Sequence, residues 1–552
     1  MKSGSREDAE PSSPATLSRA PILSRLELAA GALLLLALVY VHWTVLRETG
    51  ALWRDEVSSV NVATLPTLAE MVRHHHWDSF PILWCAVLRG WILLGFGESD
   101  LGLRVLGMLI GLGIVGALWW NARRFGHRVP LISLLVFAAS PTAFRYGDAV
   151  RGYGLGALLM LLAAGAIWSL VERPSPRRAI AALAASVLCV QSLFTNSAML
   201  LALCIAGAAV CARRRAWKAL GWLFGIGFLS MLTMLPYLRV LEIHSEWSMI
   251  VQAPIDLAWI GNQFTDAVVL SGEFALWVWL GLGALTLAAC GIALARKRAS
   301  EREKDLALFA ATALVAGAAC FTAYIRAISV PTQPWYYLPI LALAAVTFDA
   351  GVDLLVRASR IGRSLRLAGV ALFALAISGK VREALPLRVT TMDAIAERLE
   401  DVTAPDDLIV VNPWFAGITF ARYYRGPAPW MIVPDLDARL YQPYGAFKER
   451  MAQENPIQRE LERIATTLRS GHRVWLAGGL QFLQPGEQPG SLPPAPNGPL
   501  GWNEPSYTVL WSRQTAHLVQ TKAQTIRPVP LRDRGPTIWY EDLPLAVAEG
   551  WR

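Results

Sequence analysis

Apolar runs recur along the chain from Leu26 to Leu385 and then stop. Runs of about 18 or more apolar residues are typical of transmembrane helices. They predict about eleven crossings, several of them short, at Leu26–Leu46, Leu101–Trp120, Val129–Phe144, Tyr153–Val171, Ala179–Phe194, Ser197–Ala212, Leu220–Leu238, Glu273–Ala295, Leu306–Ile328, Trp335–Leu355 and Leu367–Leu385. The pattern therefore predicts a polytopic α-helical membrane protein.

The part after about Pro386 is polar and proline-rich and has no such run. Its patterns alternate between helix and strand, which favours a small sheet covered by helices. We expect helices at Met392–Asp401, Ala416–Tyr424 and Phe447–Leu468, strands at Leu408–Asn412, Met431–Val433 and Arg473–Leu476, and a long loop at Gln484–Pro499. The predicted units are a disordered cytoplasmic tail (1–25), a membrane domain (26–385) and a soluble α/β domain (386–552). A binding or lid role for the last unit is a hypothesis.

Composition agrees with this division. The 552 residues are 54% hydrophobic and only 17% charged, and the mean hydropathy of +0.39 excludes an ordinary soluble protein. The net charge of +9 raises nucleic-acid binding as a remote alternative. The basic residues, however, gather in short segments between the apolar runs, where they orient a membrane protein by staying on the cytoplasmic side. We therefore expect no nucleic-acid partner.

The segment Pro81–Gly97 decides the topology, because it is apolar but short. If it lies in the interface, the basic clusters that follow later crossings all fall in the cytoplasm, and if it crosses, they all fall outside. The charge rule therefore favours placing Pro81–Gly97 in the interface. The segment before it, Thr67–Trp77, can form an amphipathic interfacial helix. The segments placed on the non-cytoplasmic face are Asp55-Glu56, Arg145–Arg151, Arg239–Gly272, Pro331–Gln333 and the C-terminal domain. The expected location is a bacterial plasma (inner) membrane.

Two adjacent acids, Asp55 and Glu56, directly follow the first crossing, beside Leu52 and Trp53. Most carboxylates in extramembrane loops have no chemical role. A carboxylate beside apolar and aromatic neighbours can instead be partly desolvated, which raises its pKa and makes it a better base. Both residues are therefore candidates for catalysis.

A second polar cluster, Arg145, Asp148 and Arg151, lies at a predicted membrane boundary. It can be a self-neutralising structural group, or its guanidinium groups can face an anionic head group while Asp148 orients one of them. Arginine suits phosphate because its planar fork makes two parallel charge-assisted hydrogen bonds. Arg104 is a third cation on the same face, although a lone arginine there is more often an anchor to the interface.

Metal binding is a weaker possibility. Three consecutive histidines, His74 to His76, cannot all bind one ion from a regular helix. The six cysteines fall in apolar segments without metal-ligand spacing. Trp335 and Tyr336 begin a late crossing as an aromatic interface belt does, and aromatic faces can also stack on a sugar ring.

Taken in order, these motifs resemble the GT-C superfamily of membrane glycosyltransferases that use polyprenyl-phosphate sugars. The closest branch is the group of protein O-mannosyltransferases and lipid A aminoarabinose transferases. The resemblance covers about the first third of the chain. It rests on Arg54-Asp55-Glu56, on the segment from Asp78 to Trp84, on Gly95 to Arg104, on Arg123 to Gly126 and on Ser140 to Tyr153.

The resemblance implies a role for each matching residue. Asp55 matches the catalytic base, with Glu56 its usual neighbour. Asp148 and Arg151, with Arg145 close by, match a polar site near the donor phosphate, and Arg104 matches a recurrent arginine. We also expect four residues to line the substrate: Asp78, Tyr153, Trp335 and Tyr336. Many relatives have an arginine before the tyrosine of a late span, whereas this chain has Trp335.

The implied reaction is a single displacement that inverts the anomeric centre and moves a sugar from a polyprenyl-phosphate donor to a hydroxyl of a lipid, protein or glycan. No cofactor is required, and a divalent metal is not excluded. The alternatives are a lipid-linked saccharide transporter or flippase, an envelope polysaccharide polymerase or ligase, and a receptor or assembly factor without enzymatic activity. Against a transporter, the notable charges gather at one face rather than within the crossings.

Overall fold

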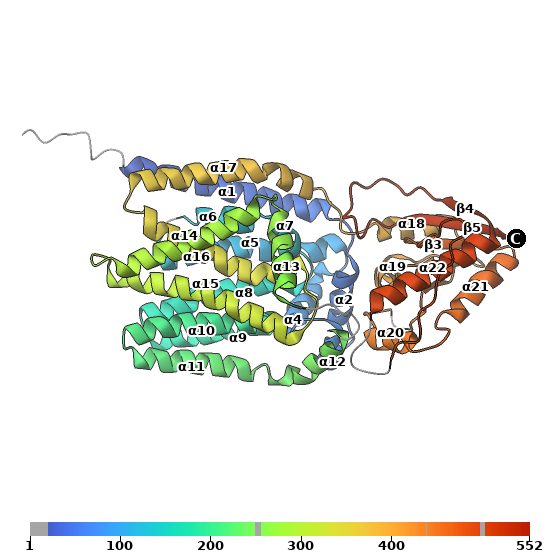
Figure 1. The fold of residues 1–552 in the computed structure, drawn as a ribbon, viewed down its shortest axis with the longest axis horizontal. Coiled ribbons are helices and arrows are strands. Elements are labelled where there is room, and N and C mark those ends of the chain that lie inside the picture. Colours follow the sequence, from blue (N-terminus) through green and yellow to red (C-terminus); the bar gives the residue numbers. More distant parts are fainter. Residues whose placement is uncertain (1–19, 128, 249–254, 438, 497–502) are drawn as a thin grey trace, which may run out of the picture.

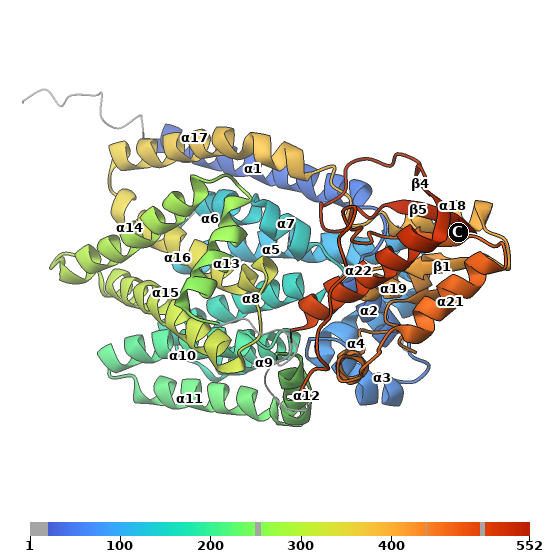
Figure 2. The ribbon, with the colours of Figure 1, turned by 45° about the vertical axis from the view of Figure 1, so that its right-hand side comes forward.

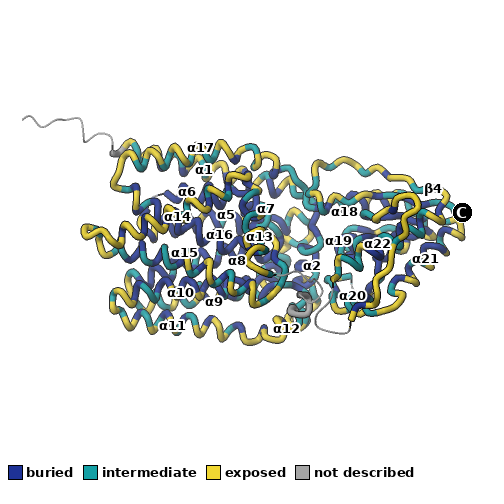
Figure 3. The backbone as a smooth tube through the Cα atoms, in the orientation of Figure 1, coloured by how far each residue is buried: buried dark blue, intermediate teal, exposed yellow. Residues whose placement is uncertain are grey.

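The computed structural model describes residues 20–127, 129–248, 255–437, 439–496 and 503–552. A bundle of long helices lies beside a smaller domain of strands and helices, which packs against one end of the bundle (Figure 1). Each part buries a large hydrophobic cluster of its own (Figure 3). The predicted fold class, a polytopic helical bundle with a C-terminal α/β domain, is confirmed.

Nine helical segments of the described residues are long and apolar enough to cross a membrane. Each coincides with one of the predicted crossings. Their helices are α1 (Ala20–Glu48), α5 (Asp100–Phe125), α8 (Gly152–Glu172), α10 (Asn196–Arg213), α11 (Trp217–Leu232) continued by α12 (Leu238–Ser248), α14 (Ala275–Ala295), α15 (Glu301–Ile328), α16 (Leu338–Val356) and α17 (Arg360–Ala384). Helix α1 begins at Ala20, so it includes the end of the predicted tail, and residues 1–19 of that tail lie outside the described residues.

The two other predicted crossings form shorter helices. The first, near Ala179–Phe194, is the 17-residue helix α9 (Pro176–Ser192). The second, near Val129–Phe144, divides into α6 (Leu131–Ser133), a π-helical turn and α7 (Pro141–Gly147). A proline cannot continue a helical hydrogen-bond ladder, and Pro141 follows the break.

A buried carboxylate accepts hydrogen bonds from the backbone amides at the start of the broken segment. Asp349 of α16 accepts hydrogen bonds from the backbone amides of Ile132 and Ser133, each at 3.0 Å. Backbone amides inside a bilayer need protein partners because no water is present there. The start of this segment is therefore held by a residue of α16 that lies 217 and 216 positions further along the sequence.

Short helices lie at the end of the bundle that faces the C-terminal domain (Figures 1 and 2). The first is α2 (Arg54–Ala63), which carries the two adjacent acids, and the second is α3 (Leu68–His74). The predicted interfacial segment forms α4 (Ile82–Trp91), which a π-helical turn extends to Phe96 and which is shorter than a crossing requires. Helix α13 (Leu257–Val269) belongs to the predicted outer loop Arg239–Gly272, whose residues 249–254 lie outside the described residues.

The C-terminal domain is built on a five-stranded sheet in the order β2-β1-β3-β5-β4. Strand β1 (Leu408–Val411) runs parallel to β2 (Trp430–Ile432) and β3 (Val474–Ala477), and these three strands lie close to the three that were predicted. Strands β4 (Ala523–Pro528) and β5 (Leu545–Trp551) are antiparallel and were not predicted.

The helices of this domain follow the predictions in part. Those expected near residues 392–401 and 416–424 are confirmed, and the one expected at Phe447–Leu468 is two helices, because the chain turns at Pro456 between them. The predicted loop Gln484–Pro499 has neither helix nor strand up to residue 496, and its last three residues lie outside the described part. The helices are α18 (Met392–Val402), α19 (Gly417–Tyr423), α20 (Tyr444–Met451), α21 (Gln458–Arg469) and the unpredicted α22 (Glu504–Lys522).

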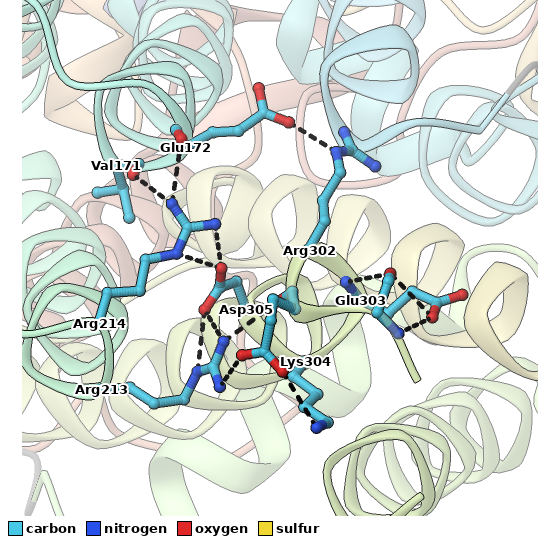
Figure 4. Close-up of polar contacts among 10 residues, drawn as sticks. Val171, Glu172, Arg213, Arg214, Arg302, Glu303, Lys304 and Asp305 are labelled. Atoms are coloured by element: carbon cyan, nitrogen blue, oxygen red, sulfur yellow. Dashed lines mark hydrogen bonds and ion pairs between the residues drawn. The ribbon is translucent and has the colours of Figure 1, made fainter. Parts of the chain in front are cut away.

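Ion pairs connect helices at the end of the bundle remote from the C-terminal domain. The buried carboxylate of Asp305 lies between the guanidinium groups of Arg213 and Arg214 (Figure 4). Arg302 binds Glu172 at 2.6 Å in the same network. Several basic residues between the crossings therefore connect α8, α10 and α15.

Candidate active site

Helix α2 places its first turn at the junction of the bundle and the C-terminal domain. The helix starts a few residues after α1 ends, and the Glu56 side chain accepts the backbone amide of Trp53 at 3.1 Å, which caps the helix start. Asp55 and Glu56 therefore leave the same turn in different directions. Glu56 points into the bundle and is 1% exposed, whereas the side chain of Asp55 is 23% exposed.

Glu56 is fully engaged by hydrogen bonds. Arg104 of α5 donates to its two oxygens at 3.0 and 2.9 Å, and the backbone amide of Val150 donates at 2.9 Å. Together with the Trp53 amide this makes four donors, which match the roughly four acceptor positions of a carboxylate. Glu56 therefore connects the start of α2 to α5 and to the loop before α8.

Arg104 is engaged in the same way. Besides Glu56, its guanidinium donates to the backbone carbonyls of Gly50 and Ala51 at 2.8 and 2.7 Å. The side chain is buried. Its geometry is that of a structural ion pair, so the catalytic role expected of Glu56 and the phosphate role expected of Arg104 are not carried into our proposal.

Arg151, at the start of α8, lies beneath the first turn of α2. One of its amino groups donates to Asp78 Oδ1 at 2.6 Å, to Ser59 Oγ at 2.9 Å and to the backbone carbonyl of Asp55 at 3.0 Å. Burial lowers the pKa of Arg151, but the carboxylates of Asp78 and Asp55 raise it more, so the net pKa is raised and the group stays charged.

Asp78 is the central acceptor of this group. It accepts from Arg151, from the Ser59 hydroxyl at 2.6 Å and from the backbone amide of Ser79 at 2.9 Å, and it is 1% exposed. Asp78, which was predicted to line the substrate, thus forms a buried ion pair that holds Arg151 in position. Phe80 adds a ring 4.4 Å from the guanidinium carbon.

Asp148 and Arg145 contact other helices. Asp148 is buried, and its Oδ2 forms a hydrogen bond with Nδ1 of His42 in α1 at 2.6 Å. Burial raises the pKa of Asp148, and His42 only partly offsets this. Arg145 donates to the backbone carbonyl of Ala384 at the end of α17 at 3.1 Å, and burial lowers the pKa of Arg145. The structure therefore separates these two residues from the group formed by Arg151 and Asp78.

Aromatic side chains extend from α2 toward α16. Trp335 packs edge-on against Trp53, with ring centres 5.7 Å apart, and its ring also lies 6.3 Å from that of Tyr153. Tyr336 lies 5.6 Å from Tyr153. The predicted substrate-lining residues Tyr153, Trp335 and Tyr336 thus form one aromatic surface next to the turn that carries Asp55.

Arg54 belongs to the motif Arg54-Asp55-Glu56, but no role was predicted for it from the sequence. Its Nε lies 3.7 Å from Asp55 Oδ1 and 3.9 Å from Glu541 Oε1, and its guanidinium carbon lies 4.0 Å from the ring centre of Phe415. Its Nε has no hydrogen-bond partner within the described residues. Burial lowers the pKa of Arg54, but Asp55 and Glu541 raise it more, so this cation is retained.

The C-terminal domain supplies the other neighbours of Asp55. Gln442 donates from Nε2 to Asp55 Oδ1 at 3.3 Å, and Asp55 Oδ2 has no hydrogen-bond partner among the residues that the structure describes. Burial raises the pKa of Glu541 to about 7, with a further contribution from Asp55. No local signal could have identified Gln442 or Glu541, because each is hundreds of residues from α2.

The three histidines make aromatic contacts. His74 stacks on Trp77 with ring centres 4.3 Å apart, and Trp77 stacks on Tyr441 of the C-terminal domain. Within the described ranges, no group of three or more histidine, cysteine, aspartate or glutamate side chains could hold a metal ion.

Comparison with protein families and with curated proteins finds no match. Solved structures do match in fold. ArnT from Cupriavidus metallidurans bound to undecaprenyl phosphate is 14% identical, with a TM-score of 0.53 over 94% of this chain and 97% of that one. Its apo state gives a TM-score of 0.51 over the same shares, at 14% identity. The oligosaccharyltransferase of Archaeoglobus fulgidus in the apo form is 10% identical, with a TM-score of 0.50 over 94% of this chain and 75% of that one.

Both neighbours belong to one superfamily of membrane proteins, and the match extends through the bundle and the C-terminal domain. Identities of 10 and 14% concern the fold rather than the reaction. The chain therefore shares the fold of the ArnT and oligosaccharyltransferase structures, which is the fold that the resemblance of its first third predicted.

Proposed function

We propose that this protein is an inverting glycosyltransferase that moves a sugar from a polyprenyl-phosphate donor to an acceptor hydroxyl on the non-cytoplasmic face of the membrane. The observation that carries the proposal is the state of Asp55. It is a partly exposed carboxylate with one unoccupied oxygen among the described residues, beside a cation and an aromatic surface, at the end of a membrane bundle. A general base needs a free oxygen that the acceptor can reach.

In this mechanism Asp55 Oδ2 takes the proton of the acceptor hydroxyl. The acceptor oxygen then forms a bond to the anomeric carbon while the bond from that carbon to the phosphate oxygen breaks. The electron pair of the broken bond leaves with the polyprenyl phosphate from the opposite face, which inverts the configuration. The leaving group is an anion, so nearby positive charge lowers the barrier.

Arg54 and Arg151 are the cations we assign to that phosphate. Arg54 presents a guanidinium whose Nε lacks a hydrogen-bond partner in the described part of the chain, at the same turn as the base. Arg151 is held by Asp78, Ser59 and the Asp55 carbonyl, so it supplies charge from a fixed position. Arg104 is left out because its Nε and both amino groups donate within the protein, whereas Nε of Arg151 has no partner among the described residues.

The lipid-linked donor is supported by the fold comparison, since the ArnT structure that this chain resembles was solved with undecaprenyl phosphate bound. The acceptor hydroxyl can belong to a lipid, a protein or a glycan. The scheme uses no cofactor, and the same site in a polymerase or ligase would use the same donor chemistry.

The test is turnover by the purified protein in liposomes. Undecaprenyl-phosphate-linked hexoses and pentoses serve as donors, envelope lipids and glycans of a deletion strain serve as acceptors, and released undecaprenyl phosphate is measured by mass spectrometry. We expect release that requires an acceptor and that the Asp55→Asn variant abolishes while its melting temperature stays unchanged. Movement of the intact lipid-linked sugar without release would establish a transporter instead, and near wild-type turnover by Asp55→Asn would exclude this base.

The proposed face has its own test. The C-terminal domain contains no cysteine, and Ser491 is exposed in its long loop, whereas Lys297 is exposed in the connection between α14 and α15. A membrane-impermeant maleimide added to intact spheroplasts is expected to label Ser491→Cys but to label Lys297→Cys only after lysis. The reverse pattern would place the C-terminal domain in the cytoplasm.

A further inference from the structure

One segment of the C-terminal domain lies across α2. The carbonyl of Leu440 accepts from Asn61 Nδ2 at 2.9 Å, and the ring of Tyr441 stacks on Trp77 with centres 4.3 Å apart and planes within 5°. Gln442 follows and contacts Asp55. Three consecutive residues thus bind the part of the membrane domain that carries the proposed base.

A second contact fixes the position of this domain. The Tyr423 hydroxyl of α19 accepts the backbone amide of Leu52 at 2.6 Å and donates to Asp100 Oδ2 at 2.6 Å. Arg422 binds the other oxygen of Asp100 at 2.6 Å. The domain is therefore held on both sides of α2, and the approach of Gln442 to Asp55 follows from that docking.

The Gln442 amide is oriented by a neighbour. Its oxygen accepts from the Tyr444 hydroxyl at 2.7 Å, which directs its amino group to Asp55 Oδ1 at 3.3 Å. Burial raises the pKa of Tyr444, so its hydroxyl remains a donor at physiological pH. An amide held in this orientation can only donate to Asp55, and a donor favours the ionised form of a carboxylate.

We propose that Gln442 is a positioning residue for Asp55 and that Tyr444 holds it in place, so that the soluble domain completes the active site. This inference rests on the proposed function. The amide occupies Oδ1 and leaves Oδ2 for the acceptor hydroxyl. A residue of the C-terminal domain therefore determines which oxygen of the base faces the acceptor.

The test measures the protonation of Asp55 itself and needs no substrate. A carbodiimide with glycine ethyl ester labels protonated carboxyl groups, and peptide mass spectrometry of the full-length protein in nanodiscs gives the pH of half-maximal labelling at Asp55. We expect Gln442→Ala to move this midpoint upward by about 0.5 pH unit, because a hydrogen bond to the charged form is lost. Tyr444→Phe should move it in the same direction by less, and Gln442→Glu should move it further than Ala.

Leu440→Ala is the matched control, since it truncates an exposed side chain of the same segment and should leave the midpoint unchanged. Superimposable labelling curves for Gln442→Ala, Tyr444→Phe and wild type would overturn the inference. If Gln442→Ala does not fold, Tyr444→Phe, which removes one hydroxyl, decides the matter. Turnover by Asp55→Asn tests the proposed function separately, so failure of either idea can be recognised. With an active donor, the acidic limb of kcat/KM should follow the labelling midpoint.

Discussion

Glu56 and Arg104 form a buried bidentate ion pair, with nitrogen–oxygen distances of 3.0 and 2.9 Å. The preceding residue, Asp55, has a partly exposed carboxylate with one oxygen that lacks a partner in the described ranges. Two adjacent acids on one helical turn therefore differ in what surrounds them. One holds the loops together, and the other is available for chemistry.

This difference predicts opposite results for two isosteric variants. Glu56→Gln leaves the Arg104 guanidinium buried without its counter-charge, which costs about 3–5 kcal/mol for a buried pair. We expect a large loss of folded protein in size-exclusion chromatography and a lower melting temperature. Asp55→Asn should melt as the wild type does while losing turnover. Equal melting temperatures for both variants would contradict the structural role of Glu56.

The second prediction concerns Arg54 as a phosphate ligand. Arg54→Gln should weaken the affinity for undecaprenyl phosphate by roughly tenfold, since a charge-assisted hydrogen bond contributes about 1.5–3 kcal/mol. Arg54→Lys should recover part of the loss, because lysine keeps the charge but not the planar fork. Binding is measured in nanodiscs by thermophoresis.

Arg425→Gln is the control for this series, because the hydrogen bonds of that guanidinium go to nearby backbone carbonyls of the C-terminal domain. Its affinity for undecaprenyl phosphate should equal that of the wild type. Unchanged affinity in Arg54→Gln would remove Arg54 from the donor site and leave Arg151 as the only assigned cation.

The sequence was sufficient for the bundle because each crossing is encoded in contiguous residues. A bilayer requires a run of apolar residues for every helix, so nine of the eleven predicted crossings are recovered. Of the other two, one is the helix α9, which has only 17 residues. The other is broken before Pro141, and its first backbone amides bind Asp349. A hydrophobic run alone does not show such a break.

The candidate site was predictable only where it is local. The motif around Asp55 identified the turn, but the partners of Glu56 and Asp55 lie 48 and 387 residues away in Arg104 and Gln442. Charge spacing cannot distinguish a cation that faces a ligand from one that faces another carboxylate. Strands β4 and β5 were missed for a similar reason, since antiparallel pairing late in the chain follows no helix–strand alternation.

Glu541 provides a pH-dependent test of the junction. Burial raises its pKa from an ordinary value of 4.5 to about 7. A raised pKa in an acid means that the folded state binds the proton more tightly, so this contribution to stability is complete below pH 4.5 and is lost as pH rises through 7. The loss is at most about 3 kcal/mol.

The glutamine side chain of Glu541→Gln is neutral at every pH, so the variant lacks this pH-dependent contribution to stability. We therefore expect the melting temperature of the variant, relative to that of the wild type, to increase steadily between pH 4.5 and 7.5, with fluorescence-based unfolding in detergent as the measurement. A difference that stays constant over this range would show that Glu541 is already ionised in the folded protein.

The last prediction concerns the contact between α5 and the loop that leads to Arg151. A Cβ atom at Gly107 would lie 1.8 Å from the backbone carbonyl oxygen of Asp148, which cannot rotate away as a side chain could. Gly107→Ala must therefore displace α5 from this loop, at a typical cost of about 1–3 kcal/mol. Because the loop also carries the Val150 amide that binds Glu56, both thermal stability and turnover should fall. Gly116→Ala, on the same helix with no atom within 4 Å of the added Cβ, should leave both unchanged. If the two alanine variants behave alike in melting and turnover assays, close contact at Gly107 does not hold the loop before Arg151 in place.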